Sequence, residues 1–278
     1  MQYRLKSPIR AMGMAVAAVI LMLPGVVQAQ DSERPEEING HPNLNGIWQA
    51  MNTANWNLEA HSAEALNQFW ELGAFGAIPA GRSVITSHDE IPYLPEAEKQ
   101  REKNRANWPG ADPAAKCYLP GIPRANYMPF PFQIIQGTGD ILFAYQFHAT
   151  NRKIHMTDHK APPVDTWMGR SNGHWEGDTL VVETTGLNGN TWLDRSGNHH
   201  SSEMTVTERF TLIDDSHMQY EATIEDPKTF SEPWTIEMIL YRNIDPDAQL
   251  LEYRCVPFAE PLLYHDIDPD LIPPEDRE

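Results

Sequence analysis

The sequence predicts a mainly β protein, an antiparallel meander barrel preceded by helices and a proline-rich strap. From residue 132 onward, short runs rich in β-branched and aromatic residues alternate with turn signals. The connections between these runs are short, so successive strands are expected to be antiparallel neighbours. Many such strands need a closed barrel or a two-sheet sandwich to hide their edges, and we favour the barrel.

The first 29 residues have the layout of a secretory signal peptide. A basic start precedes an apolar run, and small residues flank Gln28 at Val27 and Ala29. The apolar run is short and is broken by Pro24, so we favour cleavage after Ala29 over a retained membrane anchor. We therefore expect a periplasmic or secreted protein. Diffusible cofactors are scarce in those compartments, so we expect an activity without a cofactor.

Residues 30–131 are expected to form an arm, helices and a strap. A turn leads into a short strand at residues 45–49. Helical spacing of apolar residues predicts a helix over residues 62–72, and a polar, exposed helix is expected over residues 96–108. Residues 112–131 are rich in proline, which lacks the N–H that a strand ladder needs, so this segment is predicted to run as an extended strap.

Residues 132–265 are predicted to form the barrel body, lipocalin-like in broad architecture. Its expected strands are 132–136, 141–148, 152–157, 174–176, 179–185, 203–213, 217–225, 233–242 and 250–255. Gly177-Asp178 between two of them is a strong hairpin signal. The acidic, proline-bearing tail at residues 266–278 is expected to fray.

The chain carries a formal net charge of −18. An acidic surface repels nucleic acid and anionic lipid heads, so neither nucleic acid nor, after signal cleavage, a membrane is an expected partner. We expect a small-molecule substrate or ligand instead. A solvated acidic coat without meaning for any partner is the alternative interpretation of the charge.

The chain contains two cysteines, Cys117 and Cys255. An oxidising compartment permits a disulfide between them. Because the closed loop would be long, such a bridge would stabilise the fold by roughly 4–5 kcal/mol. Two separate buried thiols are the alternative. Neither cysteine lies in a CxxC pattern, which argues against thiol-redox and zinc-ribbon sites.

Glu208 is the first candidate catalytic residue. In a strand over residues 203–213 it shares one face with four apolar side chains: Met204, Val206, Phe210 and Leu212. A carboxylate on such a face loses hydration and must find a partner or take up a proton. A carboxyl group with a raised pKa is a usable general acid or base. The alternative is a structural ion pair with a neighbouring arginine, for which the candidates are Arg170, Arg242 and Arg254.

Histidines form the second candidate group. His148, His155 and His159 lie close together in the sequence. His199 and His200 are adjacent on a loop just before the strand expected at residues 203–213. Imidazole transfers protons near neutral pH and binds zinc or copper. The sequence contains neither HxH nor HExxH, so no metal site is assigned. His155 and His200 are predicted to transfer protons, and a surface or hydrogen-bonded role is the alternative for each.

Four tryptophans are expected to line the ligand site: Trp167, Trp175, Trp192 and Trp234. Indole rings wall apolar cavities, although packing in the core is the alternative. Arg170 follows the first of them and would stabilise developing negative charge. The sequence shows no phosphate-binding glycine loop, GxSxG elbow, kinase motif or EF-hand.

Several blocks of the chain resemble a large group of secreted bacterial proteins, most of which are uncharacterised. The most specific block is W-E-G-D-T-L-V-V-E-T within residues 167–186. The other blocks are L-N-G-I-W at 44–48, C-Y-L-P-G-I-P-R at 117–124, His200-Ser201, Glu208-Arg209-Phe210 and Asp226-Pro227. The resemblance implies a common fold and no particular activity. This chain has Asp158-His159-Lys160 where such proteins often read D-G-R, so no role is carried over to that segment.

Together these features favour an enzyme. We expect a periplasmic, cofactor-independent lyase or isomerase that acts by acid/base chemistry on a small apolar or aromatic compound bearing oxygen. His155, His200 and Glu208 would move protons, and Arg170 would hold negative charge. This expectation requires that the groups meet in one hydrophobic pocket. The alternatives are a binding or carrier protein that uses the same pocket and a metalloprotein with ligands from the histidine group.

Overall fold

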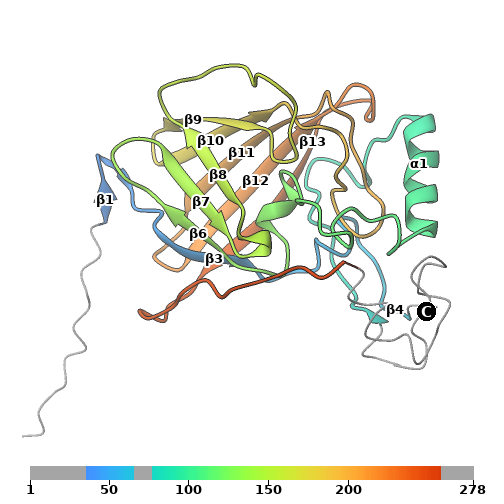
Figure 1. Ribbon diagram of the computed structural model, residues 1–278, viewed down its shortest axis with the longest axis horizontal. Coiled ribbons are helices and arrows are strands. Elements are labelled where there is room, and N and C mark those ends of the chain that lie inside the picture. Colours follow the sequence, from blue (N-terminus) through green and yellow to red (C-terminus); the bar gives the residue numbers. More distant parts are fainter. Residues whose placement is uncertain (1–35, 66–76, 258–278) are drawn as a thin grey trace, which may run out of the picture. The chain divides into compact units, whose positions relative to one another are not determined.

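Nine strands close into a barrel in the computed structural model, which describes residues 36–65 and 77–257 (Figure 1). The strand order around the barrel is β10-β11-β12-β13-β3-β6-β7-β8-β9. This confirms the predicted mainly β barrel. The predicted signal peptide, the acidic tail and most of the helix expected at residues 62–72 lie outside the described residues.

The barrel strands follow the predicted runs closely. They are β3 (Gly46–Ala50), β6 (Phe132–Ile135), β7 (Ile141–Tyr145), β8 (Asn151–His155), β9 (Arg170–Glu176), β10 (Thr179–Thr185), β11 (Thr205–Leu212), β12 (His217–Glu225) and β13 (Trp234–Arg242). Two short hairpins lie outside the barrel sheet: β1 (Glu37–Ile38) with β2 (His41–Pro42), and β4 (Glu64–Ala65) with β5 (Ala77–Ile78).

Alternating side chains build the barrel core. In β12, Met218, Tyr220, Ala222 and Ile224 are fully buried, whereas the residues between them are partly exposed. The same alternation runs through β13 and β11. Since successive side chains of a strand point to opposite faces, each strand contributes every second residue to one interior. The alternation of apolar and polar residues along each strand therefore determines which side chains form the core.

Barrel closure involves three pairings that the sequence pattern did not predict, two of them made by β3. β3 comes from before the strap and lies between β13 and β6, antiparallel to both. β8 and β9 are parallel, paired at Ile154 with Ser171 and at His155 with Asn172. Parallel neighbours need a crossover, which residues 156–169 supply. The sheet is thus mixed, and the prediction of a purely antiparallel meander was wrong at this one seam.

Two predicted elements differ in the structure. Residues 250–255 form no strand, because β3 already occupies the edge of β13 and leaves no free edge for a further strand. The helix expected to begin at Ser62 does not begin there, since Glu64 and Ala65 pair with β5 instead. Among the described residues one α-helix is present, where helices were expected in the plural.

The helix α1 (Pro95–Ala106) confirms the polar helix expected at residues 96–108. A proline in its first turn has a backbone angle suited to a helix start, and acidic residues in that turn and basic residues in the last suit the helix dipole. Its buried side is narrow. Asn104 Nδ2 donates to Gly197 O over 3.1 Å, and the Ala97 carbonyl lies 2.9 Å from His199 Nε2. The helix thereby fastens the loop between β10 and β11.

The proline-rich strap passes into the barrel. Its turn at Arg124–Asn126 is buried, and Arg124 forms a two-pronged ion pair with Asp112, both N···O distances being 3.1 Å. Asn126 reaches the side chains of β7, β11 and β12 inside the barrel. The strap therefore plugs the barrel as well as crossing it.

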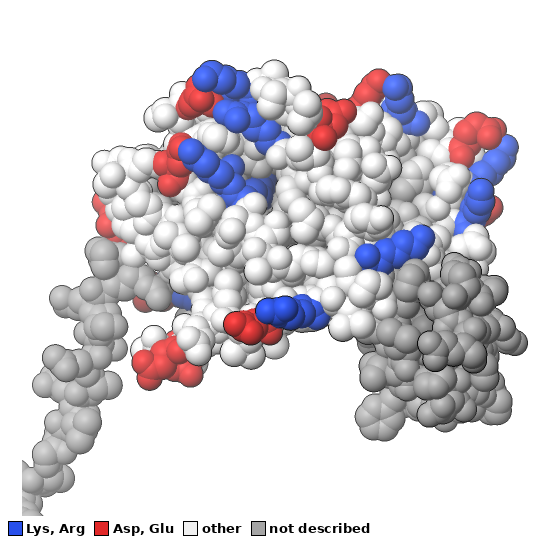
Figure 2. All heavy atoms as spheres, viewed as in Figure 1, with Lys and Arg blue, Asp and Glu red and all other residues white. Residues whose placement is uncertain are grey.

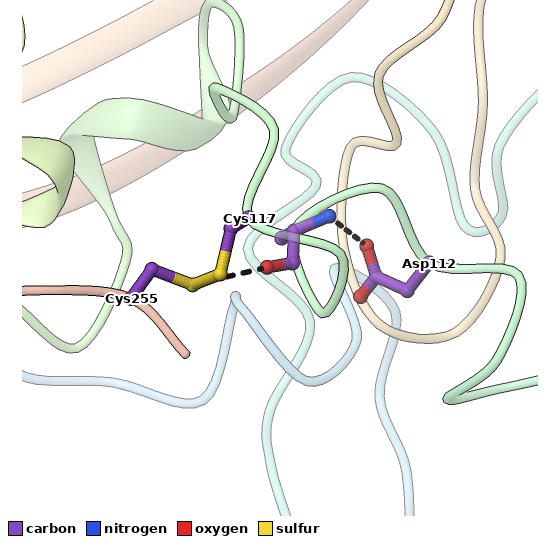
Figure 3. Close-up of a disulfide and its surroundings, with 4 residues drawn as sticks. Asp112, Cys117 and Cys255 are labelled. Atoms are coloured by element: carbon purple, nitrogen blue, oxygen red, sulfur yellow. Dashed lines mark hydrogen bonds between the residues drawn. A yellow bond between two sulfur atoms is a disulfide. The ribbon is translucent and has the colours of Figure 1, made fainter. Parts of the chain in front are cut away.

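Cys117 and Cys255 form a disulfide, which resolves the alternatives left open by the sequence (Figure 3). The bridge joins the strap to the segment that follows β13 across 138 residues of chain. Beside it, Ala114 N donates to Asp112 Oδ1 over 2.9 Å. A disulfide is compatible with an oxidising compartment. Among the described residues, no helix has the length and apolar character that crossing a membrane requires.

Candidate functional site

The four predicted catalytic residues lie in three different environments. Glu208 points into the barrel, His200 is buried in the loop before β11, and His155 and Arg170 line a pocket on the outside of the barrel wall. The structure thus brings His155 and Arg170 together. It places His200 and Glu208 elsewhere, and each of those two has its own partners.

Glu208 is the centre of a polar network inside the barrel. Its side chain is fully buried and forms an ion pair with Arg152 of β8. Asn126 Nδ2 donates to Glu208 Oε1 over 2.6 Å, and the Tyr220 hydroxyl donates to the same oxygen over 2.9 Å. This arrangement matches the structural alternative for Glu208. The partner is, however, an arginine outside the three candidates.

The network continues to neighbouring strands. The Tyr145 hydroxyl donates to Asn126 Oδ1 over 2.8 Å. On the other side, Arg152 donates from Nε to Ser171 Oγ and from Nη2 to Thr184 Oγ1, each over 2.7 Å. Burial raises the pKa of Tyr145 above its usual value, and the nearby Glu208 carboxylate raises it further. The phenol therefore stays protonated and serves as a donor, so the network is satisfied from several strands.

His200 is held on both ring nitrogens. Nδ1 lies 2.8 Å from the Ser201 carbonyl and so must donate to it, which leaves Nε2 to accept from the Thr191 hydroxyl over 2.5 Å. The ring is 3% exposed. Burial lowers the pKa of His200 to about 4, so the ring is neutral at pH 7. Through these contacts His200 links Thr191 to Ser201 within the loop between β10 and β11.

The crossover pocket is a cavity of about 240 Å³ between the parallel seam and residues 162–169. On β8, Lys153 and His155 alternate with buried Arg152 and Ile154, so their side chains lie on the outer face of the barrel. Arg170 begins β9 beside them. The other lining residues are Asn151, Arg152, Pro162, Pro163, Val164, Thr166, Met168, Gly169 and Ser171. The crossover residues 162–169 supply one wall of the pocket, so the pocket depends on the crossover.

His155 and Arg170 are the two predicted catalytic residues that line this pocket. Partial burial lowers the pKa of His155, and the positive charges of Arg170 and Lys153 lower it further. The imidazole is therefore neutral near pH 7 and able to accept a proton. Arg170 Nη2 donates to the Asp158 carbonyl over 2.9 Å, which positions the guanidinium at the crossover. Arg170 Nε is buried and has no hydrogen-bond partner among the described residues.

The crossover pocket combines two kinds of wall. Pro162, Val164 and Met168 supply apolar surface, whereas Lys153 and Arg170 supply positive charge. Such a cavity suits a small apolar molecule with an anionic or partly negative oxygen. A neutral base beside a fixed cation can remove a proton from that molecule and stabilise the resulting negative charge.

The four predicted ligand-site tryptophans do not form one wall. Trp167 stacks on Tyr118 with ring centres 4.7 Å apart, and Trp175 stacks on His41 at 4.5 Å. Trp192 and Trp234 are buried, with Trp234 fully inside the core cluster. Trp175 lines a separate pocket of about 330 Å³. Core packing and surface stacking therefore account for their positions.

The histidines considered as metal ligands lie apart from one another. His159 Nε2 lies 2.8 Å from the Gly173 carbonyl, and His199 Nε2 lies 2.9 Å from the Ala97 carbonyl. Within residues 36–65 and 77–257, the one grouping of three potential ligands is Cys117, His148 and Cys255, in which the two sulfurs already share a bond. No all-histidine ligand set is present in this part of the chain.

The sequence-based prediction did not include Arg152, Asn126 and Tyr220, the partners of Glu208, or Tyr145, which donates to Asn126. The signal for Arg152 was available, because it shares a face of β8 with Ile154 just as Glu208 shares a face with apolar residues. Two opposite charges on the apolar faces of two strands are the pattern of a buried pair. Asn126 carried no such signal, since it comes from the strap.

On the face shown in Figure 2, lysine and arginine side chains lie next to aspartate and glutamate side chains. Near the crossover pocket, Lys153 forms an ion pair with Asp140 and Lys160 forms one with Asp158, each at 2.8 Å. The likeness of the W-E-G-D-T-L-V-V-E-T block to secreted bacterial proteins stays a prediction. Comparisons of the chain with protein-family profiles, characterised proteins and solved structures gave no significant match.

Proposed function

We propose that the protein is an exported, cofactor-independent lyase or isomerase whose active site is the crossover pocket. The observation that carries this proposal is the pairing of His155, whose pKa is lowered, with Arg170 in one pocket that also has apolar walls. Export to the periplasm or beyond is supported by the disulfide and by the layout of the first 29 residues.

The proposed chemistry starts with a C–H bond next to a carbonyl group. His155 takes the proton, the electron pair moves into the carbonyl, and Arg170 holds the resulting enolate oxygen. Return of the proton to a different carbon completes an isomerisation. Departure of a group from the neighbouring carbon, with the proton, completes an elimination. Both routes balance without an oxidant or a reductant.

The test follows proton exchange, because exchange reports the first step of both routes. The protein is incubated in D₂O with a panel of aryl-substituted 2-oxo acids and ketones, and loss of the C–H signal is followed by NMR. We expect at least one compound to exchange faster than in buffer. His155→Gln should lower the enzymatic rate by about 10²–10⁴-fold.

His174→Gln is the matched control, because His174 is exposed on β9 and does not line the crossover pocket. Its exchange rate should equal that of the unaltered protein. Equal rates in the His155→Gln and His174→Gln variants would remove His155 from the mechanism. Failure of the whole panel to exchange would remove the proposed reaction class.

A binding or carrier function is the second candidate. It is favoured by the full engagement of Glu208 and His200 in their own contacts, which leaves the pocket with fewer proton-transfer groups than expected. In that case the panel compounds should quench or shift tryptophan fluorescence at saturable concentrations while their NMR spectra in D₂O stay unchanged. The two readouts on one set of samples separate the candidates.

A further inference from the structure

Three side chains from distant parts of the chain converge at the disulfide. Cys117 lies in the strap, His148 in the turn after β7, and Cys255 in the segment after β13. The two sulfurs and a ring nitrogen of His148 lie within 4.8 Å of one another. Two sulfurs and one imidazole are a ligand set that zinc uses in proteins.

The backbone at two of these residues is unusual. Cys117 has a φ angle of 64° and His148 one of 60°, in the left-handed region that residues other than glycine seldom adopt. Ala149, with a φ of 47°, continues this conformation beside His148. Such outliers cost free energy and persist only where the surroundings enforce them. Here they belong to two of the three converging residues.

Aromatic packing holds the histidine ring in place. Phe147 contacts His148 edge-on with ring centres 4.4 Å apart, and Phe147 packs on Tyr253 at 5.3 Å. Tyr253 lies two residues before Cys255, so the same cluster positions the third member of the set. The ligand geometry is therefore supported from both sides.

One ring nitrogen of His148 lacks a hydrogen-bond partner in the part of the chain that the structure describes. Its Nε2 atom is buried and has no hydrogen-bond partner among the described residues. A buried polar atom without a partner costs free energy, so its persistence calls for an explanation. A metal ion bound by the ring nitrogen that lies near the two sulfurs would give this ring a polar partner.

We propose that reduction of the Cys117–Cys255 disulfide creates a zinc-binding site of two thiolates and the His148 imidazole. A dithiol reductant supplies two electrons and two protons and is itself oxidised to a disulfide. The metal then displaces the two thiol protons. Tetrahedral zinc places such ligand atoms roughly 3.3–3.8 Å apart, which side-chain rotation can reach from the present grouping. The fourth position stays open to water or a small ligand.

This site is separate from the crossover pocket, and none of its three residues lines that pocket. The inference therefore does not rest on the proposed lyase or isomerase function. Oxidised protein keeps the bridge and binds no metal there. Reduced protein binds one metal ion, so the state of the disulfide decides whether the site exists.

The experiment uses Co²⁺, because thiolate-bound cobalt absorbs strongly where free cobalt does not. The full mature chain without an affinity tag is reduced with a phosphine under argon and titrated with Co²⁺ and then Zn²⁺. We expect one equivalent of cobalt with thiolate absorption, displaced by zinc, and no such band in oxidised protein. Absence of the band in reduced, folded protein would overturn the proposal.

His148→Asn tests the third ligand, since asparagine tolerates the left-handed backbone but is a poor zinc ligand. We expect cobalt affinity to fall at least tenfold in this variant. His159→Asn is the matched control and should keep the affinity of the unaltered protein. Equal affinity in both variants would overturn the assignment of His148.

Near-UV circular dichroism shows whether the reduced chain is folded. If reduction alone unfolds it, one equivalent of zinc should restore the signal in the unaltered protein but not in the His148→Asn variant, because metal binding then drives folding. A reduced chain that stays unfolded in the presence of zinc would also contradict the proposal.

Discussion

Glu208 and Arg152 form a buried ion pair inside the barrel. Both side chains are almost fully buried, at 0% and 3% exposure, and removal from water costs several kcal/mol for each ion. The pair persists because Asn126, Tyr220 and Thr184 complete the hydrogen bonds around it. Removing one partner leaves the other charge buried without compensation.

We expect Glu208→Gln to destabilise the protein by about 3–5 kcal/mol, because the Arg152 charge then lacks its counter-ion. Urea unfolding measures the change. The double variant Glu208→Gln with Arg152→Met should recover part of the loss, since neither charge remains. A loss in the double variant that equals the sum of the two single losses would contradict this account.

His200 couples folding to pH. Its pKa is about 4 in the folded protein against 6.5 ordinarily, because burial disfavours the charged ring. Between those values the unfolded chain binds more protons, so the free energy of unfolding falls as the pH drops from 6.5 to 4. The expected loss is about 3 kcal/mol. Urea unfolding of the unaltered protein and of His200→Gln at several pH values should show it as a change in the difference between their free energies of unfolding.

Asp194 changes the free energy of unfolding with pH in the opposite direction to His200. Burial raises its pKa from 3.8 to about 6, so the folded state binds the extra proton and gains stability as the pH falls through this range. The His200 effect is therefore measured as the difference between the unaltered protein and His200→Gln, in which the Asp194 contribution cancels. A difference that does not change between pH 7 and pH 4 would contradict the contacts assigned to His200.

At the scale of elements, the crossover from β8 to β9 decides where the pocket lies. A parallel pair needs a connection that returns along the barrel, and residues 156–169 make that connection over the outer face. Gly169 stands at its end with a φ of 64°. A Cβ atom there would meet the Thr185 carbonyl oxygen at 2.7 Å. Any other residue at this position would be strained by both the backbone angle and this contact.

We expect Gly169→Ala to lower the free energy of unfolding by about 1–3 kcal/mol, because both the backbone angle and the contact are unfavourable. Gly177→Ala is the control, with a φ of 60° and no atom within 4 Å of the added Cβ. The Gly177→Ala variant has the unfavourable backbone angle but no steric contact, so it measures the cost of the angle alone. Denaturation of the two variants should show the larger loss at Gly169, and equal losses would mean that the close approach to Thr185 is relieved by a small shift.

At the scale of the whole molecule, the disulfide links the strap to the segment after β13. The loop that it closes spans 138 residues, so it removes much freedom from the unfolded chain. Replacing both cysteines by serine should destabilise the protein by roughly 4–5 kcal/mol. Chemical unfolding of this variant, with the oxidised unaltered protein as reference, checks the value. A loss under about 1 kcal/mol would show that the unfolded chain is already constrained.

The antiparallel strands and the polar helix could be predicted because their signals are local. Alternation in β12 and β13, the Gly177-Asp178 turn and the polar composition of α1 are properties of neighbouring residues. Residues 250–255 looked equally suitable for a strand. They form none because strand formation also needs a free edge, which β3 had taken.

The site could be predicted only in part for the same reason. His155 and Arg170 share a pocket because the parallel seam and its crossover bring them together. His200 is buried and hydrogen-bonds to Thr191 and Ser201. Glu208 forms its ion pair with Arg152, which was not among the three candidate arginines. Alternation along β8 places Arg152 on the buried face, but the strand that it meets is set by the register around the barrel.

By itself, the sequence determined which segments can be strands, the acidic character of the chain and which two cysteines could form a bridge. Tertiary structure decided the closure by β3, the parallel seam, the ion-pair partner of Glu208 and the pocket that joins His155 to Arg170. The physical reason is that side-chain alternation depends on adjacent residues, whereas pairing and burial depend on which strand edges and charges remain unsatisfied after the barrel has closed.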